Sequence, residues 1–494
     1  MEVLKIGQLF HPHRTVALII RLVPYLSSVG IKFSILVPMQ PATPPDLVPP
    51  TSTAPRKTAP PASSSHSSED ISTKQRNFLM MAAHQIAFRS GWIFKTESVI
   101  IPAVLDSISG AGWVRGLLPL LNRVGHSIPP LILAGRLEQA ARKKWTLMIT
   151  SWLMVGCFLL WSVLFTPLAA VLASWKAILF LVIYALFFCC VGVNQLALNT
   201  LQGKLIPTKS RGRLLYVSSV VGAFTAVTCA LCILPSCLSP VEPRFDWLFL
   251  FPAAMFGIAA ALVFGIREYA DPSSDRPRTR QNVFVTAVQT LQNDRNFCKL
   301  AFVGFAASSS ILLFPHYQHL GLQQMRLELK QLMWWVVIQN VGTAMFSIPM
   351  GAVADRGGNR LVLQIFMITM AAAPISALAI TMFASSSWFV FVFLLIGSTP
   401  VVIRTLQNFT LEVCTSKDHA QYLSTLNVCL ALPMVFSPFA GWCVDLFGFT
   451  SVFIGVTVVI LAGWCVTFSL NEPRNENRSL GNHAQLMCED DHIP

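Results

Sequence analysis

Charged residues are scarce in this sequence. Asp, Glu, Lys and Arg make up 12% of its 494 residues, whereas hydrophobic residues make up 54% and Phe alone contributes 34. A soluble domain carries about 25% charged residues to cover its surface. The shortage therefore excludes an ordinary soluble protein and indicates a chain surrounded by lipid, which replaces water as the outer solvent.

The sequence also lacks the motifs of several enzyme classes. It has no G-x-x-x-x-G-K-[ST] nucleotide-binding loop, no G-x-S-x-G turn and no H-E-x-x-H motif. Its 12 Cys lie mostly within apolar runs, as Cys157, Cys190 and Cys429 do, and no Cys/His cluster has the spacing of a zinc site. We therefore expect no enzyme activity, no cofactor and no metal site.

The chain divides by composition into an extension and two apolar regions. Residues 1–76 form an N-terminal extension, of which 41–76 are rich in Pro, Ser and Thr and are predicted to be a disordered linker. Residues 1–38 either form an interfacial or extra membrane segment or precede a true start at Met39. An amphipathic helix on the membrane surface, or else a solvated linker helix, is predicted in the polar connection 267–298, and 471–494 form a tail.

Apolar stretches of about 20 residues, the length that crosses a bilayer, fill the two remaining regions, 77–266 and 299–470. The expected spans lie near 78–105, 112–134, 145–166, 177–200, 214–236 and 246–266, and near 299–320, 332–353, 361–383, 388–410, 421–446 and 450–470. The predicted fold is an all-α membrane protein with twelve transmembrane helices in two six-helix bundles.

Lys and Arg are distributed unevenly among the connections. Those after spans 2, 4, 6, 8 and 10, together with the C-terminal tail, hold 19 of these residues, whereas the alternate connections hold 5. Basic connections stay on the cytoplasmic side of a membrane. Both termini are therefore predicted to be cytoplasmic, and the net charge of +13 is attributed to these connections rather than to nucleic-acid binding.

The two apolar regions contain an internal repeat. Residues 199–202 read Asn-Thr-Leu-Gln, and residues 404–407, 205 positions later, read Arg-Thr-Leu-Gln. Residues 216–219 read Tyr-Val-Ser-Ser, and residues 422–425, 206 positions later, read Tyr-Leu-Ser-Thr. The matches equate spans six apart, which predicts parallel halves related by a pseudo-twofold axis along the membrane normal.

The connection after span 8 carries a recognisable motif. Residues 351–360 read Gly-Ala-Val-Ala-Asp-Arg-Gly-Gly-Asn-Arg, which resembles the G-x-x-x-D-R-x-G-x-R loop of the major facilitator superfamily. The first-half copy at 134–144 is degenerate, with Glu138 in place of Asp. Together with the six-plus-six spans and the repeat, this makes residues 77–474 similar to a bacterial-type secondary transporter.

The resemblance implies a fold, a function and a location. Such transporters move a small solute by rocking two halves about a central site, and we expect a monomer among the lipids of the bacterial inner membrane. The motif would act as a conformational latch whose contacts break when the halves move. Its residues here are Gly351, Asp355, Arg356, Gly358, Arg360 and Glu138; the alternative is a simple basic loop.

Charged groups within the spans are candidates for function, because burying them in lipid costs several kcal/mol. In span 1, Gln85, Arg89, Ser90, Thr96 and Glu97 would occupy an arc of roughly 140° on a continuous helix. Lys95 lies off that arc and is expected to extend outward. Glu97 and Arg123 of span 2 lie at similar depths, which makes an ion pair between them plausible, either structural or linked to protons.

The resemblance places spans 1, 4, 7 and 10 around the central cavity. The predicted solute-binding residues are Arg89, Glu97, Arg123, Asn194, Asn199, Asn340, Arg404 and Gln407. The Asn and Gln side chains could instead hold helices together. The candidates for coupling to a proton or another ion are Glu97, His126 and His316. The excess of basic groups favours an anionic or zwitterionic solute; the alternative function is a non-transporting sensor or assembly factor that keeps the fold.

Overall fold

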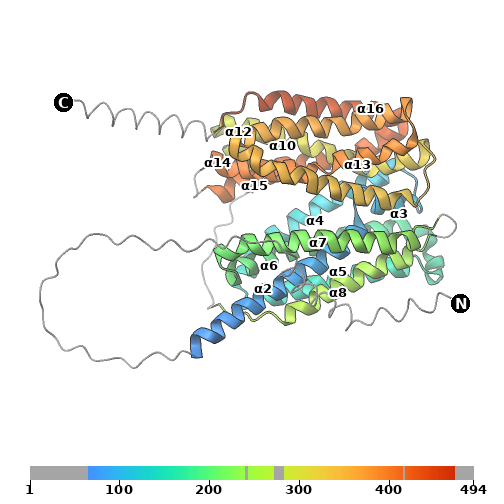
Figure 1. Cartoon of the computed structure of the whole chain (residues 1–494). Helices are drawn as coiled ribbons and strands as arrows, with labels where there is room; N and C mark the ends of the chain where they lie inside the picture. Colours follow the sequence, from blue (N-terminus) through green and yellow to red (C-terminus); the bar gives the residue numbers. More distant parts are fainter. Residues whose placement is uncertain (1–64, 240–242, 272–282, 415–417, 473–494) are drawn as a thin grey trace, which may run out of the picture. The chain divides into compact units, whose positions relative to one another are not determined.

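The computed structural model describes residues 65–239, 243–271, 283–414 and 418–472 (Figure 1). All regular elements within these residues are helices. We refer to 65–271 as the first half and to 283–472 as the second half. The helices of the first half are α2 (Ser65–Trp92), η2 (Ile93–Lys95), α3 (Ile100–Asp106), α4 (Gly112–Gln139), α5 (Lys144–Leu164), η3 (Pro167–Trp175), α6 (Lys176–Leu205), α7 (Thr208–Cys237) and α8 (Phe245–Phe264).

The second half is helical in the same way. Its elements are α9 (Val283–Asn293), α10 (Arg295–Ser309), η4 (Ser310–Leu313), α11 (Phe314–His319), η5 (Leu320–Gln324), α12 (Gln331–Phe383), η6 (Ser386–Phe389), α13 (Val390–Ile396), α14 (Thr399–Val413), α15 (His419–Val435) and α16 (Ser437–Thr467). Helix α9 lies in the connection where an amphipathic helix was predicted. Helix α2 begins at Ser65, so residues 65–76, which were predicted to belong to the disordered linker, are helical.

Eight helical segments among the described residues are long and apolar enough to cross a membrane. They are Lys144–Leu164, Ala173–Leu205, Ser210–Cys237, Phe245–Phe264, Arg295–Gln324, Arg356–Phe383, Ser386–Val413 and Gln421–Thr467. Helix α4 is not among them, because Arg115 and Arg123 lower its hydropathy. Both of these side chains make hydrogen bonds to the second half. The low hydropathy of α4 is therefore explained by its place between the halves.

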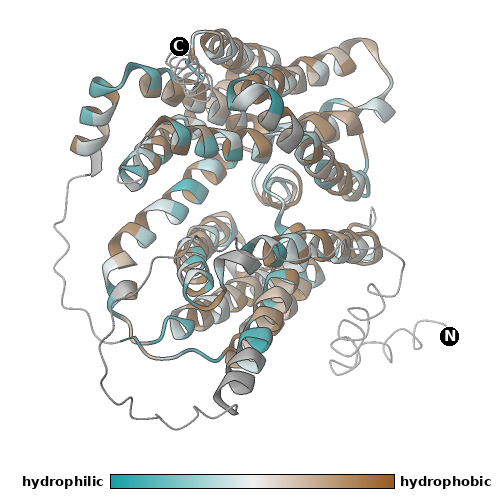
Figure 2. Ribbon diagram, turned by 60° about the vertical axis from the view of Figure 1, so that its left-hand side comes forward, coloured by the Kyte–Doolittle hydropathy of each residue, from teal (hydrophilic) through white to brown (hydrophobic). Residues whose placement is uncertain are grey.

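Hydrophobic residues, brown in Figure 2, run along most of the helices, and many large apolar side chains lie on the outer surface. Phe383, Ile348 and Phe224 are 86%, 80% and 71% exposed. Side chains of this size would be costly to expose to water, at about 25 cal/mol per Å² of apolar surface. Lipid removes that cost, so the apolar exterior is that of a multi-pass membrane protein.

Two of the long helices turn sharply at glycine. Helix α12 bends at Gly358 and α16 at Gly448, where φ is +77° and +75°. Only glycine adopts this backbone conformation without a steric cost. Each long helix therefore contains two successive straight segments that run in different directions.

The halves meet along α4 with α16 and α7 with α12, and also where α11 lies against α3 and α4 and where α15 lies against α4. The backbones of α4 and α16 approach so closely that a methyl group on Gly112 or Gly441 would collide with the facing main chain. The same holds for Gly116 against Ser437, whose hydroxyl donates to the Gly116 carbonyl at 2.5 Å. Small residues permit such contact between membrane helices, where dispersion and hydrogen bonds drive association.

Candidate functional site

The first expected span is interrupted in its middle. Helix α2 ends at Trp92, the 3-10 turn η2 covers Ile93–Lys95, and α3 starts only at Ile100. Non-helical backbone at membrane depth is tolerated where protein or a water-filled cavity surrounds it. Broken helices of this kind surround the binding sites of many transporters. The continuous arc predicted for span 1 therefore fails beyond Ser90, because the helical repeat does not continue through the break.

Lys95 and Glu97 form an ion pair at this break. Lys95 Nζ lies 2.6 Å from Glu97 Oε1, and the Lys95 side chain is 1% exposed. Its ammonium group also lies 3.5 Å from the centre of the Trp92 ring and 4.3 Å from that of Phe188. The prediction that Lys95 extends outward is thus wrong, because the change from α-helix to 3-10 turn directs it into the first half.

The predicted pairing of Glu97 with Arg123 is also wrong. The second oxygen of Glu97 accepts a hydrogen bond from the Asn122 amide instead. Arg123 donates from Nη2 to the main-chain carbonyl of Asn427 on α15, at 2.6 Å. Equal depth did not bring the pair together, because Asn122 precedes Arg123 by one residue and faces a different direction on α4. Arg123 consequently bridges the two halves.

His126 belongs to the cluster around Glu97. Its Nδ1 lies 3.1 Å from the Asn122 side-chain oxygen, and its ring packs against Phe188. His316, the other histidine candidate, lies fully buried in α11, and neither of its ring nitrogens has a hydrogen-bond partner among the described residues. The structure therefore places only one of the two histidines beside Glu97.

Arg89 and Arg404 come from opposite halves and lie within electrostatic range of each other. Arg89 is half-buried on α2, and its side chain packs against Gly222 of α7. Arg404 is exposed on α14, and Gln407 is half-buried one turn further along the same helix. No ion pair to either arginine is found among the described residues. Two neighbouring guanidinium groups repel each other unless an anion lies between them.

The predicted amide side chains differ in their surroundings. Asn194 is 1% exposed on α6 and donates to Thr150 and Ser151 of α5, at 2.9 Å in both cases. It therefore holds two helices of one half together, as the alternative interpretation proposed. Asn340 donates to the Val336 carbonyl of its own helix. Asn199 is exposed, and its side-chain oxygen accepts from Gln195 of the same helix.

In the motif after span 8, Gly358 and Arg360 contact Phe468 and Glu472, which follow α16, the last helix of the described residues. The Arg360 main-chain N–H donates to Glu472 Oε2 at 2.8 Å, and its guanidinium donates to the Phe468 carbonyl. A methyl group on Gly358 would collide with the Glu472 carboxylate. Arg356 is exposed. The surroundings of Gly351 and the side chains of Asp355 and Glu138 lie outside the described part of the structure.

Glu268 occupies the matching position in the first half. Its two carboxylate oxygens accept from the main-chain N–H groups of Lys143 and Lys144, at 3.0 and 2.8 Å, where α5 begins. Carboxylates stabilise helix N-termini in this way. Hydrogen bonds from Lys143 and Lys204 lower the pKa of the neighbouring Asp271 below its ordinary value. These contacts show how each half ties its last helix to the start of an earlier one.

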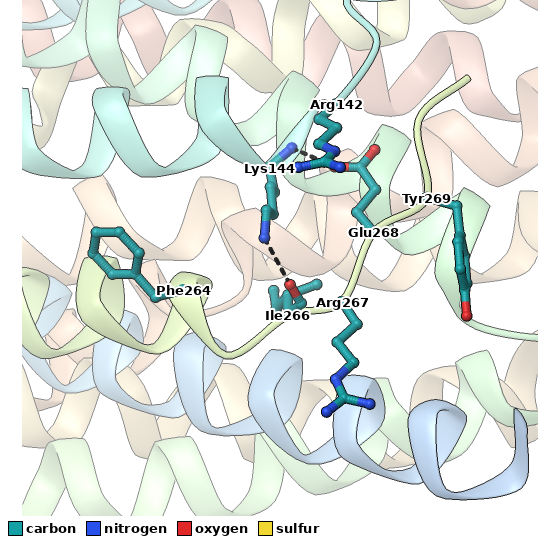
Figure 3. A pocket seen from close by; sticks show the side chains of 7 residues that line it. All are labelled: Arg142, Lys144, Phe264, Ile266, Arg267, Glu268 and Tyr269. Carbon is teal, nitrogen blue, oxygen red and sulfur yellow. Dashed lines mark hydrogen bonds between the residues drawn. The ribbon is translucent and has the colours of Figure 1, made fainter. Parts of the chain in front are cut away.

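A shallow pocket lies beside Glu268 (Figure 3). Its lining residues are Arg142, Lys144, Phe264, Ile266, Arg267, Glu268 and Tyr269. Lys144 crosses it to donate to the Ile266 carbonyl at 3.0 Å. The pocket is formed entirely by the first half and contains none of the predicted solute-binding residues, so we do not assign the solute to it.

Sequence reasoning missed several residues that the structure brings together. Asn122 has no motif or periodic signal. Asp106 and Arg115 lie at the ends of spans and were treated as parts of a connection, yet both contact His319 of the second half. Their opposite charges, nine residues apart across a short connection, were the available signal. Within the described residues, no three His, Cys, Asp or Glu side chains are arranged to hold a metal ion.

The second half matches a known family, and the fold as a whole matches solved transporters. The family model described as Major Facilitator Superfamily matches residues 322–486. No curated protein matches the chain in sequence. A nucleoside transporter superposes with a TM-score of 0.62 at 8% identity, covering 81% of this chain and 99% of its own. The E. coli fucose:proton symporter gives 0.53 at 14% identity, with 81% and 99% covered.

A third solved structure, a bacterial homologue of the iron transporter ferroportin in an inward-facing state, superposes with a TM-score of 0.59 at 13% identity. It covers 80% of this chain and 98% of its own. At such identities the likeness establishes the fold alone. Residues 322–486 are thus similar to the Major Facilitator Superfamily, the chain shares its fold with solved transporters, and its apolar helices are those of a multi-pass membrane protein.

Proposed function

We propose that the protein is a secondary active transporter of a small anionic or zwitterionic solute, which it moves by rocking its two halves. One observation carries the proposal. Arg89 of the first half and Arg404 of the second lie within electrostatic range of each other, and no ion pair to either is found among the described residues. A carboxylate or phosphate between them would relieve the repulsion through charge-assisted hydrogen bonds.

The other predicted solute-binding residues divide into those that can still contact the solute and those that hold helices together. Gln407 lies on the helix that supplies Arg404, Arg123 bridges the halves, and Asn199 is exposed on α6; all three remain candidates. Glu97 would act through its pairing with Lys95. Asn194 and Asn340 already donate within the protein, so we assign them to the structure of their own halves.

We propose the full arrangement as twelve spans in two six-helix bundles related by a pseudo-twofold axis along the membrane normal. Gly192 packs against α4 and Gly397 against α12, so that a methyl group on either would collide with the neighbouring helix. These two glycines are 205 positions apart, the same offset as Asn199 and Arg404. Glu268 and Glu472, 204 positions apart, contact the corresponding connections. Such structural pairs support the repeat inferred from the sequence.

We propose that both termini are cytoplasmic in a bacterial inner membrane, as the basic connections favour. With this orientation, the hydrogen bonds between the two halves lie near the middle of the membrane or on its external side. They join Asp106 to Gln318 and His319, Arg115 to His319, Gly112 to Asp445, Gly116 to Ser437, Ser98 to Gln339 and Arg123 to Asn427. This distribution supports a state that is closed to the outside and open to the cytoplasm.

Coupling to protons is part of the proposal. The fucose:proton symporter and a D-xylose-proton symporter share the fold, and Glu97, His126 and His316 remain candidate proton carriers. In the same proposal the Arg360–Glu472 contact acts as the cytoplasmic latch, and Arg356 meets anionic lipid headgroups.

A flux screen in liposomes tests the function. Purified protein would be reconstituted, and uptake of labelled mono- and dicarboxylates, sugar phosphates and amino acids would be measured with and without an imposed pH gradient. We expect saturable uptake of at least one anionic or zwitterionic compound, which Arg404→Gln abolishes and Lys330→Gln preserves, since Lys330 pairs with Glu328 at the surface. Binding without flux would indicate a sensor that keeps the transporter fold.

A further inference from the structure

The pocket beside Glu268 lies where two candidate membrane spans end. Helix α5 starts at Lys144 and α8 ends at Phe264, and both helices are among the eight segments that can cross a membrane. The pocket has a volume of about 260 Å³ and is lined by these two helix ends and by the residues that flank them (Figure 3). It therefore lies at the boundary between lipid and water, at the level of the phospholipid headgroups.

Three of the seven lining side chains are basic, and none of the three has a carboxylate partner among the described residues. Arg142 and Arg267 are exposed, and no hydrogen bond or ion pair of either guanidinium is found within that part of the chain. Lys144 donates to the Ile266 carbonyl at 3.0 Å, which uses one of its three N–H donors. The pocket thus presents cationic donors that the described residues do not occupy.

The neighbouring charged side chains, in contrast, are paired. Lys143 forms an ion pair with Asp271, and Lys204 pairs with Glu268 and Asp271, at 2.9 Å in both cases. Glu268, the one acidic residue of the lining, also accepts from the main-chain N–H groups at the start of α5. Its charge is engaged by Lys204 and by the helix N-terminus, so it does not neutralise Arg142 or Arg267.

An apolar strip that faces the lipid adjoins the pocket. It consists of Trp145, Ile149 and Trp152, which are 42%, 54% and 46% exposed and whose spacing puts them on one face of α5. Phe264 of the pocket lining packs against Trp145, with ring centres 6.4 Å apart. Tryptophan is enriched at the membrane–water interface, where its ring lies at the level of the headgroups. A ligand in the pocket can therefore continue into the lipid along this α5 strip.

This combination fits a ligand with an anionic head and an apolar body. A phosphate group accepts two parallel hydrogen bonds from a guanidinium. A zwitterionic headgroup would bring an ammonium group close to three cations, which would repel it. A free phosphate would gain nothing from the apolar strip. Basic pockets at the cytoplasmic ends of membrane helices bind anionic lipid headgroups in this way.

We propose that this pocket binds the headgroup of an anionic phospholipid. Arg142, Lys144 and Arg267 line the pocket around the headgroup and neutralise its charge, and an acyl chain lies along the α5 strip. The lipid belongs to the leaflet on this side of the membrane, which is the cytoplasmic leaflet in the proposed orientation. The site is separate from the solute site, so the inference stands whether or not the protein transports a solute.

Native mass spectrometry of the delipidated protein in detergent tests the site. The probes are phosphatidylglycerol, phosphatidylcholine, inorganic phosphate and glycerophosphoglycerol, which is the phosphatidylglycerol headgroup without acyl chains. We expect phosphatidylglycerol to bind the wild type roughly tenfold more tightly than each of the other three. In the double variant Arg142→Gln/Arg267→Gln this advantage should disappear, because the guanidinium donors are gone.

The matched control removes the same charge elsewhere. Arg213 on α7 and Arg295 on α10 are exposed near the starts of their helices, and the alternation of spans puts both on the same membrane side as the pocket. Arg213→Gln/Arg295→Gln should bind phosphatidylglycerol as the wild type does. Added phosphatidylglycerol should also raise the unfolding midpoint of the wild type and the control but not of the pocket variant, since a ligand stabilises the fold that it binds.

Four outcomes would overturn the proposal. Equal binding of phosphatidylglycerol and phosphatidylcholine would show that the pocket does not select an anionic headgroup. An equal loss in the control variant would assign the attraction to the basic surface as a whole, and wild-type binding by the pocket variant would place the lipid elsewhere. Glycerophosphoglycerol or inorganic phosphate bound as tightly as the lipid would make the pocket a site for a soluble phosphate compound. If the double variant is less stable than the wild type without lipid, Arg142→Gln alone carries the test, with a partial loss of binding expected.

Discussion

Lys95 and Glu97 form an ion pair across 2.6 Å at the point where the first span is broken. The ammonium group has aromatic rings on its other sides, and the second carboxylate oxygen is bound by Asn122. The pair supplies no net charge to the site between the halves. The positive character of that site therefore depends on Arg89, Arg123 and Arg404.

Removing either partner of this pair should destabilise the protein. Glu97→Gln leaves the Lys95 ammonium group buried without a counter-charge, which costs about 3 kcal/mol. Lys95→Met should cost less, since Glu97 is 26% exposed and keeps Asn122. The double variant should recover most of the loss. Thermal unfolding of the purified protein measures all three, and a double variant less stable than both single ones would contradict the pairing.

The bend at Gly358 gives a second prediction. Gly358→Ala places a methyl group against the Glu472 carboxylate and forces alanine to adopt φ of +77°. We expect a loss of about 1–3 kcal/mol. Gly357→Ala is the matched control, because its methyl group meets only the flexible Leu361 side chain. Equal unfolding midpoints for the two variants would show that the bend is not as described.

Asn194 and Asn199, on the same helix, should respond differently to replacement by Ala. Asn194→Ala removes the donor to Thr150 and Ser151 inside the first half and should cost about 1–3 kcal/mol of stability. Asn199→Ala should leave stability unchanged and reduce solute affinity. Unfolding and binding measured on the same preparations check both expectations. A reversed pattern would place Asn194, not Asn199, at the solute.

Cysteine labelling tests the orientation of the chain in the membrane. Arg356 and Ser236 are both exposed, and the distribution of Lys and Arg predicts opposite sides for them. A membrane-impermeant thiol reagent added to intact cells should label Ser236→Cys and not Arg356→Cys in a variant without native Cys. Permeabilised cells should show both sites labelled, and the opposite pattern in intact cells would invert the topology.

The all-helical fold, the family likeness of the second half and most of the candidate spans were predictable from the sequence, because hydrophobic length and the motif after span 8 are local signals. The expected spans near 78–105, 112–134 and 332–353 are not among the eight segments.

The Lys95–Glu97 pair was not predictable. It depends on a break in the helix, and extrapolating 100° per residue past Ser90 put Lys95 on the wrong side. The roles of Asp106 and Arg115 depend on partners more than 200 positions away, which no periodic pattern specifies.

In the connection after span 8, too, the contact that forms is with a residue far away in the sequence. The sequence singled out Asp355 as the carboxylate of the latch motif. In the structure the main-chain N–H of Arg360 donates to Glu472 instead. Glu472 comes close to Arg360 only because α16 ends on the same side of the membrane as the connection after span 8. The signal available was the Glu-Pro-Arg ending at 472–474 and its counterpart Glu268 at the end of the first half.

The central claim is that guanidinium groups from both halves hold an anionic group of the solute. The most direct measurement is the affinity of the transported compound for wild type, Arg404→Lys, Arg404→Gln, Arg89→Gln and the control Lys330→Gln in detergent. Lysine keeps the charge but cannot form two parallel hydrogen bonds to a carboxylate or phosphate. We predict at least a tenfold loss for Arg404→Lys, equivalent to about 1.4 kcal/mol, with larger losses for both Gln variants. Wild-type affinity in the Arg404 and Arg89 variants alike would contradict the account.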